Sequence, residues 1–328
     1  MNDFRFAPDA QRARLIDHRM RTLLGESLEH IADQIRGQIS FNEEQLQNIA
    51  TRLKQGEKYP PSTFAIYTEL VKILLAGNFA EAEGLLAELL QENPVTNTPQ
   101  IAPLDSPLLA RQAERMKQLM GSDPDTEFPI AAPSQQVTET FTSRLGETMK
   151  LMESTIPELA GEINALISQI IMVVPDSESD YRFDGGSSYM MWGGLFLNAL
   201  SHENEIALLE VLAHESAHML LFGFCRDEML VSNSDDELFP SPLRFDPRPM
   251  DGIYHATWVS ARMHWAMSQL INSGQLTQPQ LELATSHMQA DKVNFENGYG
   301  VVKQHAKLTP TGRAVMQPAR DYMDSVPN

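Results

Sequence analysis

The sequence predicts a mainly α-helical protein with a small β-sheet (the α+β class), and three observations predict it. Over most of the 328 residues, apolar side chains recur at intervals of three and four, the spacing of one buried helix face. Runs of β-branched and aromatic residues bounded by proline or glycine occur at 170–175 and 189–198, which favours short strands there. The composition, 42% apolar and 21% charged, is that of a globular chain able to bury a core.

An N-terminal helical region is predicted over residues 1–92. Its expected helices span 8–38, 42–54 and 61–76, with a fourth that begins after Asn78. Asn42 precedes two glutamates and is therefore a predicted helix cap. Proline is frequent over 93–135, so this segment is predicted to be a connector that contains the domain boundary and a short helix at 107–120.

Residues 136–328 are predicted to form a metal-binding catalytic domain. One long helix is expected over 140–170, followed by the strands. Ser201 is the predicted cap of a helix that continues to about residue 222. A further helix is expected over 253–270, with Asp251 as its cap.

Charge and cysteine content exclude several classes of function. The net charge of −19 argues against a nucleic-acid partner, because phosphate binding needs a basic surface. A single cysteine, Cys225, excludes a domain held together by disulfides and a cysteine-rich zinc module. The N-terminus lacks the apolar core of a signal peptide, and no apolar run approaches the roughly 20 residues that span a bilayer. We therefore expect a cytoplasmic protein with no membrane partner.

The segment His214-Glu215-Ser216-Ala217-His218 carries the chemistry. Two histidines at positions i and i+4 lie on one face of a helix, so both imidazoles can bind one metal ion. Glu215 follows the first histidine and can take a proton from a metal-bound water. The surrounding residues are apolar around most of the helix, which predicts burial and argues against a pair of surface histidines. His214 and His218 are therefore predicted metal ligands.

A third ligand is sought downstream. His255 is the candidate, and the carboxylate alternatives are Asp246, Asp251 and Glu237. His264 lies nine residues after His255, two and a half helical turns away, so the two cannot share one metal ion. His264 is instead expected to be a hydrogen-bonded histidine without a metal.

Two arginines, Arg244 and Arg248, lie among prolines near the predicted site. A guanidinium in such a place suits a bidentate grip on a ligand carboxylate. The competing interpretation is a structural ion pair with Asp246 or Asp251.

The runs 211–218 and 242–252, above all the Arg-x-Asp-Pro-Arg-Pro stretch that begins at Arg244, resemble the HExxH-motif peptide-modification proteins. These proteins accompany gene clusters for ribosomally made peptide natural products (RiPP biosynthesis), and some are understood as Fe(II)- and 2-oxoglutarate-dependent peptide β-hydroxylases. The resemblance covers roughly residues 190–270. It implies a zincin-like HExxH helix beside a few strands, an iron cofactor held by the histidines, and 2-oxoglutarate gripped by Arg244 or Arg248.

The sequence is compatible with three functions. The first is a 2-oxoglutarate dioxygenase that hydroxylates a peptide side chain, with Glu215 orienting the site or binding the metal. The second is a zinc metallopeptidase in which Zn²⁺ occupies the same pair and Glu215 is the general base. The third is a degenerate, non-catalytic peptide-binding domain. In the enzymatic readings, a strand around 193–197 could hold the peptide backbone by β-augmentation. The arginines favour the oxygenase, because a peptidase has no obvious use for both.

Overall fold

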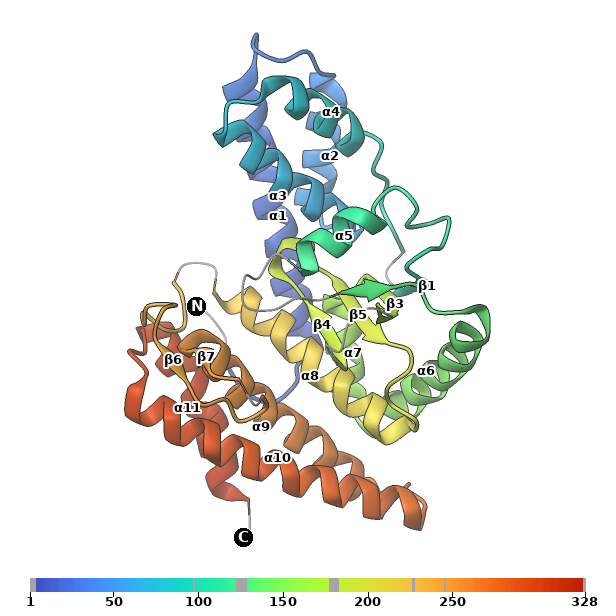
Figure 1. Cartoon of the computed structure of the whole chain (residues 1–328), viewed down its shortest axis with the longest axis vertical. Helices are drawn as coiled ribbons and strands as arrows, with labels where there is room; N and C mark the ends of the chain where they lie inside the picture. The colour runs from blue at the N-terminus through green and yellow to red at the C-terminus, as the bar shows by residue number, and fades with distance from the viewer. Residues whose placement is uncertain are drawn as a thin grey trace. The chain divides into compact units, whose positions relative to one another are not determined.

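The computed structural model describes residues 4–96, 98–121, 129–176, 183–225, 228–244 and 246–326. Pro124 of the predicted connector and Phe245 of the Arg-x-Asp-Pro-Arg-Pro stretch lie outside these residues. The described chain is mainly helical with a small sheet, which confirms the predicted fold class (Figure 1). The α-helices are α1 (Ala10–Ile35), α2 (Glu43–Lys54), α3 (Pro61–Leu75), α4 (Phe79–Leu89), α5 (Ala113–Met120), α6 (Gln135–Thr155), α7 (Pro157–Leu166), α8 (Glu205–Phe224), α9 (Met250–Asn272), α10 (Gln278–His305) and α11 (Pro310–Ser325). The strands are β1 (Gln100–Pro103), β2 (Ile130–Ala131), β3 (Gln169–Pro175), β4 (Gly185–Ser187), β5 (Gly194–Asn198), β6 (Leu238–Phe239) and β7 (Arg248–Pro249), and a 3₁₀ turn, η1, covers Tyr189–Met191.

The chain divides into two compact units. Unit 1 contains Met1–Arg12, Ser143–Ile163 and His202–Asn328, and unit 2 contains Ala13–Thr142 and Asn164–Ser201. These units do not follow the predicted boundary within 93–135, because β1 of that proline-rich segment pairs with β3 in the sheet. The HExxH helix α8 belongs to unit 1 and the sheet to unit 2, so the expected placement of the helix beside the strands stays a prediction.

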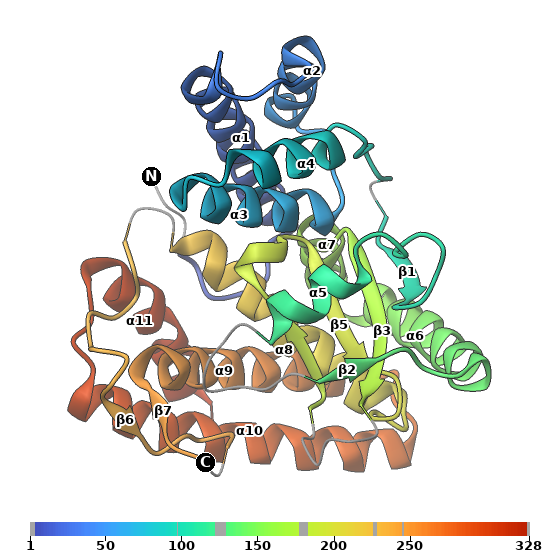
Figure 2. The same ribbon diagram turned by 45° about the horizontal axis from the view of Figure 1, so that its top comes forward.

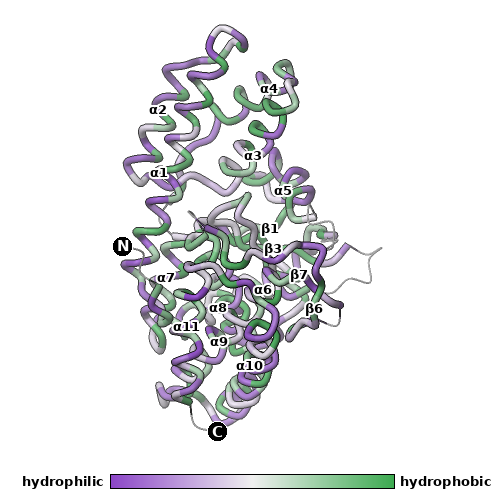
Figure 3. Tube along the Cα trace, turned by 90° about the vertical axis from the view of Figure 1, so that its left-hand side faces the viewer, coloured by the Kyte–Doolittle hydropathy of each residue, from purple (hydrophilic) through white to green (hydrophobic). Residues whose placement is uncertain are grey.

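Local sequence signals explain the first helices of unit 2. The Asn42 side chain accepts a hydrogen bond from the Gln45 backbone N–H (3.0 Å), which confirms the predicted cap of α2. Asn78 caps α4 in the same way, through the Glu81 N–H (3.3 Å). Hydrophilic and hydrophobic residues alternate along α1 and α2, as expected for helices with one buried face (Figure 3).

The sheet of unit 2 has the strand order β1-β3-β5-β4, with β2 also paired to β3 (Figure 1 labels β4, and Figure 2 labels β2). Strands β1, β3 and β5 are parallel, whereas β4 is antiparallel to β5. Because β3 and β4 occupy both edges of β5 over 195–197, that strand has no free backbone groups for a peptide there. The predicted β-augmentation at 193–197 is therefore wrong. The backbone at Gly193 lies close to the side chain of Ser168. Gly193 has a φ of 85°, and a Cβ atom there would lie 2.7 Å from Ser168 Oγ, so both conformation and space favour glycine.

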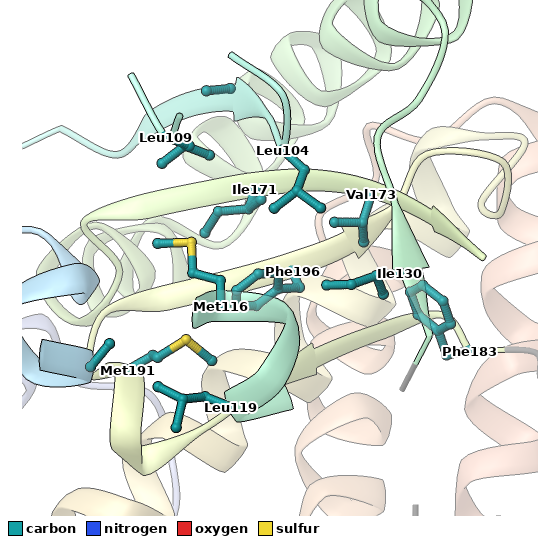
Figure 4. Close-up of a cluster of buried hydrophobic side chains, with 12 residues drawn as sticks. Leu104, Leu109, Met116, Leu119, Ile130, Ile171, Val173, Phe183, Met191 and Phe196 are labelled. Atoms are coloured by element: carbon teal, nitrogen blue, oxygen red, sulfur yellow. The ribbon is translucent and has the colours of Figure 1, made fainter. Parts of the chain in front are cut away.

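A buried apolar cluster fixes α5 on the sheet (Figure 4). Met116 and Leu119 of α5 pack with Ile171 of β3 and Phe196 of β5. The expected helix at 107–120 is shorter than predicted, because it begins at Ala113.

The helix predicted over 140–170 is in fact two helices, α6 and α7. Apolar spacing continues through the break at Ile156, so the periodicity alone did not reveal it. Pro157 is the cause, because proline is accommodated at the first position of a helix but not in its interior.

Helices α9 and α10 of unit 1 form an antiparallel hairpin joined at 273–277 (Figures 1 and 2). A Cβ atom at Gly298 of α10 would overlap the Thr257 hydroxyl of α9, so the two helices approach closely at a glycine. Helix α9 begins at Met250, and Asp251 lies in its first turn, so Asp251 is not the cap. Helices α10 and α11 and the short β6–β7 pair were not predicted.

Candidate metal centre

Helix α8 carries the HExxH motif, and its cap differs from the predicted one. Asn204, three residues after Ser201, accepts a hydrogen bond from the Ala207 N–H (3.0 Å) and begins the helix. The helix is long and apolar enough to cross a membrane, but 72% of its most apolar stretch is buried inside the protein. It is therefore a core helix, as expected for a site that excludes water.

His214 and His218 face each other as the spacing predicts. Their Nε2 atoms lie 3.0 Å apart, and the ring planes are inclined by 63°. Two imidazole nitrogens bound to one ion at about 2.1 Å lie about 3.0–3.4 Å apart, for angles between a right angle and the tetrahedral angle. The nitrogen pair therefore has a separation that one metal ion can bridge.

The other ring nitrogen of each histidine contacts helix α9. His214 Nδ1 lies 3.2 Å from Met263 Sδ, and His218 Nδ1 lies 3.0 Å from His255 Nδ1. The rings of His218 and His255 are nearly parallel, with an interplanar angle of 15°. Met263 was not identified from the sequence. Met263 lies eight residues, about two helical turns, after His255, so the sequence alone places both residues on the same face of the helix.

Glu215 is buried beside the pair. Its Oε1 atom lies 3.9 Å from His214 Nε2, and the residue is only 5% exposed. A carboxylate at this distance can bind the same metal ion or contact a water bound to it. Both predicted roles of Glu215 therefore stay open in this geometry.

Burial sets the protonation of the histidines. It lowers the pKa of His218 well below the ordinary value, and the neighbouring imidazoles of His214 and His255 lower it further. Burial also lowers the pKa of His255, against the opposing effect of Asp251. Neutral imidazoles keep a lone pair for a metal or a hydrogen bond, as metal ligation requires.

The three predicted histidines meet, but they form a chain of contacts. His255 faces Nδ1 of His218, whereas His214 faces Nε2 of the same ring. In the described part of the chain, no group of three or more His, Cys, Asp or Glu side chains is arranged around a common point as metal ligands. Ligation by His214 and His218, and by His255 as the third residue, therefore stays a prediction.

The alternative third ligands lie in different surroundings. Asp246 forms an ion pair with Arg248, and Glu237 accepts a hydrogen bond from Lys307 (2.9 Å) at the surface. Asp251 lies one turn before His255 on α9. His264 is hydrogen-bonded to the Tyr322 hydroxyl (2.8 Å), which confirms the predicted hydrogen-bonded histidine.

The two arginines differ in their environments. Arg248 is largely buried in β7, and its Nε lies 2.7 Å from Asp246 Oδ2, which is the structural ion pair considered above. Arg244 is exposed.

A second polar cluster joins α8 to α10 and was not predicted. Glu210, one turn before His214, lies 2.6 Å from His287 Nδ1 through its Oε2 atom. It is also hydrogen-bonded to the carboxyl group of Asp291, which is only 2% exposed. The Oδ2 atom of Asp291 has no hydrogen-bond partner among the residues that the structure describes. Two carboxyl groups can share a hydrogen bond only if one keeps a proton, and burial beside Glu210 raises the pKa of Asp291 to about 10.

Asp291→Asn is expected to stabilise the protein above neutral pH. A carboxyl group whose pKa is raised on folding stabilises the folded state most below its ordinary pKa of 3.8 and loses this contribution as the pH rises toward about 10. The amide needs no extra proton to donate to Glu210. We therefore expect a gain of about 1–3 kcal/mol in the free energy of unfolding at pH 8, the size of the penalty for one unsatisfied buried polar group.

Urea unfolding of wild type and Asp291→Asn between pH 5 and pH 9 measures this effect. The difference between the two proteins should grow with pH. Glu282→Gln, an exposed carboxyl on the same helix, is the matched control and should change stability little. A constant or shrinking difference would contradict the shared proton.

Comparison with known proteins adds no family to this picture. No family model matches the chain, and no curated protein matches it significantly.

Proposed function

We propose that the chain is an Fe(II)- and 2-oxoglutarate-dependent hydroxylase that acts on a peptide side chain, in the tailoring of a peptide natural product. The observation that carries the proposal is the Nε2 pair of His214 and His218, 3.0 Å apart, with the Glu215 carboxylate 3.9 Å from His214. Two imidazoles and one carboxylate are the donor set of non-haem iron oxygenases. The resemblance of the Arg-x-Asp-Pro-Arg-Pro stretch to peptide hydroxylases supports the choice of cosubstrate.

Each residue then has a defined task. His214 and His218 fit a divalent ion, because their Nε2 atoms lie at a bridging distance and the lowered pKa of His218 keeps a lone pair on that ring. When bound, iron with 2-oxoglutarate and O₂ supplies the oxidising power for hydroxylation, and succinate and CO₂ are formed. Glu215 contributes a third donor or orients a bound water. Arg248 or Arg244 binds the distal carboxylate of 2-oxoglutarate.

Two other functions compete with this proposal. In a zinc metallopeptidase, the same histidines would hold Zn²⁺ and Glu215 would act as general base. The carboxylate position beside His214 suits that role as well, so the distinction must come from the products. In a non-catalytic peptide-binding domain the cluster would retain no metal. We place the activity in the cytoplasm, since α8 is a buried core helix and the chain has one cysteine.

Succinate release tests the proposal without knowledge of the peptide. The purified full chain is incubated with Fe(II), ascorbate, 2-oxoglutarate and air, and succinate is measured. Wild type should release succinate slowly, and His214→Ala should lower the rate at least about 100-fold, because it removes a metal ligand. His264→Asn is the matched control, since His264 contacts Tyr322, and its rate should stay near wild type.

The alternative functions give different results. No succinate above the His214→Ala background, together with tightly retained zinc, would reverse the order in favour of the metallopeptidase. Wild type that retains neither metal after dialysis would favour the peptide-binding domain.

A further inference from the structure

Helix α9 contacts the imidazoles of His214 and His218 at their Nδ1 atoms. Met263 Sδ lies 3.2 Å from His214 Nδ1, and His255 Nδ1 lies 3.0 Å from His218 Nδ1. Both contacts are made at the nitrogen opposite to the Nε2 pair. Met263 and His255 are both at least nine-tenths buried, at 7% exposed each, so water competes little for these contacts.

The two contacts determine where each ring carries its proton. A metal ion bound at Nε2 needs the lone pair of that atom, so a neutral ligand histidine carries its proton on Nδ1. That N–H then needs an acceptor. The Met263 thioether can only accept, and is placed to accept weakly from His214. The Nδ1 atom of His255 can accept from His218 when its own proton lies on Nε2.

We propose that His255 and Met263 are positioning residues, which hold His218 and His214 in the tautomer and orientation that a metal ion requires. The inference rests on the proposed metal centre and gives His255 a role other than the predicted third ligand. It explains why His255 contacts the nitrogen of His218 that faces away from His214. It also gives Met263, a residue without a role in the sequence motif, a specific one.

Removal of such partners is expected to weaken metal binding without changing the number of ions bound. Loss of a residue that orients a ligand lowers metal affinity by about 10- to 100-fold. We expect His255→Ala to lower the affinity about 10-fold or more. Met263→Leu should have a smaller effect, because a thioether is a weak acceptor. His255→Asn should restore most of the affinity, since its amide oxygen can accept from Nδ1 of His218 but is a poorer metal ligand than imidazole.

The experiment uses Co²⁺ as the probe and the full chain as the protein. Affinity and stoichiometry come from competition with a coloured chelator, and the visible absorption of bound Co²⁺ reports its ligands. Met267→Leu and His264→Asn, on the same helix, are matched controls for the two residue types, and thermal melting verifies that each variant is folded. The expected result is one ion per chain, unchanged Co²⁺ absorption in His255→Ala, and rescue by His255→Asn.

Two results would overturn the assignment of His255 and Met263 even where the metal centre itself is present. If His255→Ala changes the Co²⁺ absorption and His255→Asn does not rescue the affinity, His255 is a metal ligand. If both positions give affinities equal to their controls, neither residue positions the site. Failure of the proposed function is distinguishable, because Co²⁺ binding that depends on His214 can be present without succinate release. If wild type binds Co²⁺ no better than His214→Ala, the metal centre and this inference both fail.

Discussion

Replacement of Glu162 by glutamine is expected to lower the free energy of unfolding by about 3–5 kcal/mol, because it leaves buried charge without a counterion. Glu162 of α7 is completely buried between Arg12 (4% exposed) and Arg262 of α9 (1% exposed). Its Oε2 atom lies 2.9 Å from an Arg12 nitrogen, and its Oε1 atom is paired with Arg262. Since one carboxylate serves two guanidinium groups, the cluster already carries one positive charge in excess.

Backbone carbonyl groups compensate for this excess. Arg262 donates to the Phe6 carbonyl (2.7 Å), and Arg12 donates to the Ala7 carbonyl (3.0 Å). Phe6 also stacks on Tyr322, with ring centroids 5.0 Å apart. The carboxylate therefore organises the segment 4–9 within unit 1, and its loss should expose that segment first.

Urea unfolding and hydrogen exchange test the Glu162 prediction. Glu162→Gln should unfold at lower urea concentration, and amides of residues 4–12 should exchange faster than in wild type. Glu158→Gln on the same helix is the matched control, because Glu158 is exposed and accepts a hydrogen bond from the Ala10 N–H (3.1 Å). If the free energy of unfolding of Glu162→Gln is within about 1 kcal/mol of the wild-type value, the backbone carbonyl groups alone are enough to stabilise the two buried guanidinium groups, and the prediction is wrong.

The sequence predicts local features best where one signal points to one position, as a single capping residue does. Asn42 and Asn78 cap helices because a cap is an interaction over three residues. The break at Pro157 was missed because the apolar spacing continues through it. The cap at Asn204 was missed because Ser201, three residues earlier, is an equally good cap by residue type.

In the candidate site, too, contacts within one helix could be predicted from the sequence, whereas contacts between helices could not. The facing Nε2 atoms of His214 and His218 follow from their spacing on one helix. The contacts of Met263 and of Asp291 depend on how α9 and α10 pack on α8, which no local pattern encodes. The role of His255 depends on which ring nitrogen of His218 it contacts. That contact is set by how α9 packs on α8.

Replacement of Glu215 by glutamine is expected to lower succinate release at least about 100-fold, the range seen when a group at the reacting centre is lost. Glu215 is 5% exposed, and its Oε1 atom lies 3.9 Å from His214 Nε2. Glutamine keeps the shape but removes the negative charge that would offset part of the charge of a divalent ion. In the proposed oxygenase with Glu215 as a donor, metal affinity and succinate release should therefore fall together.

In a metallopeptidase, Glu215→Gln would affect the metal affinity and the reaction rate differently. There the two imidazoles and a further ligand would hold Zn²⁺, and Glu215 would only take a proton from bound water, so Glu215→Gln would keep the metal and lose the rate. Measurement of Co²⁺ affinity beside the rate separates the two roles. Glu205→Gln, at the start of the same helix, is the matched control and should alter neither quantity. Unchanged Co²⁺ affinity in Glu215→Gln would remove the carboxylate from the ligand set, whereas a joint loss would make it the third donor and free His255 from that role.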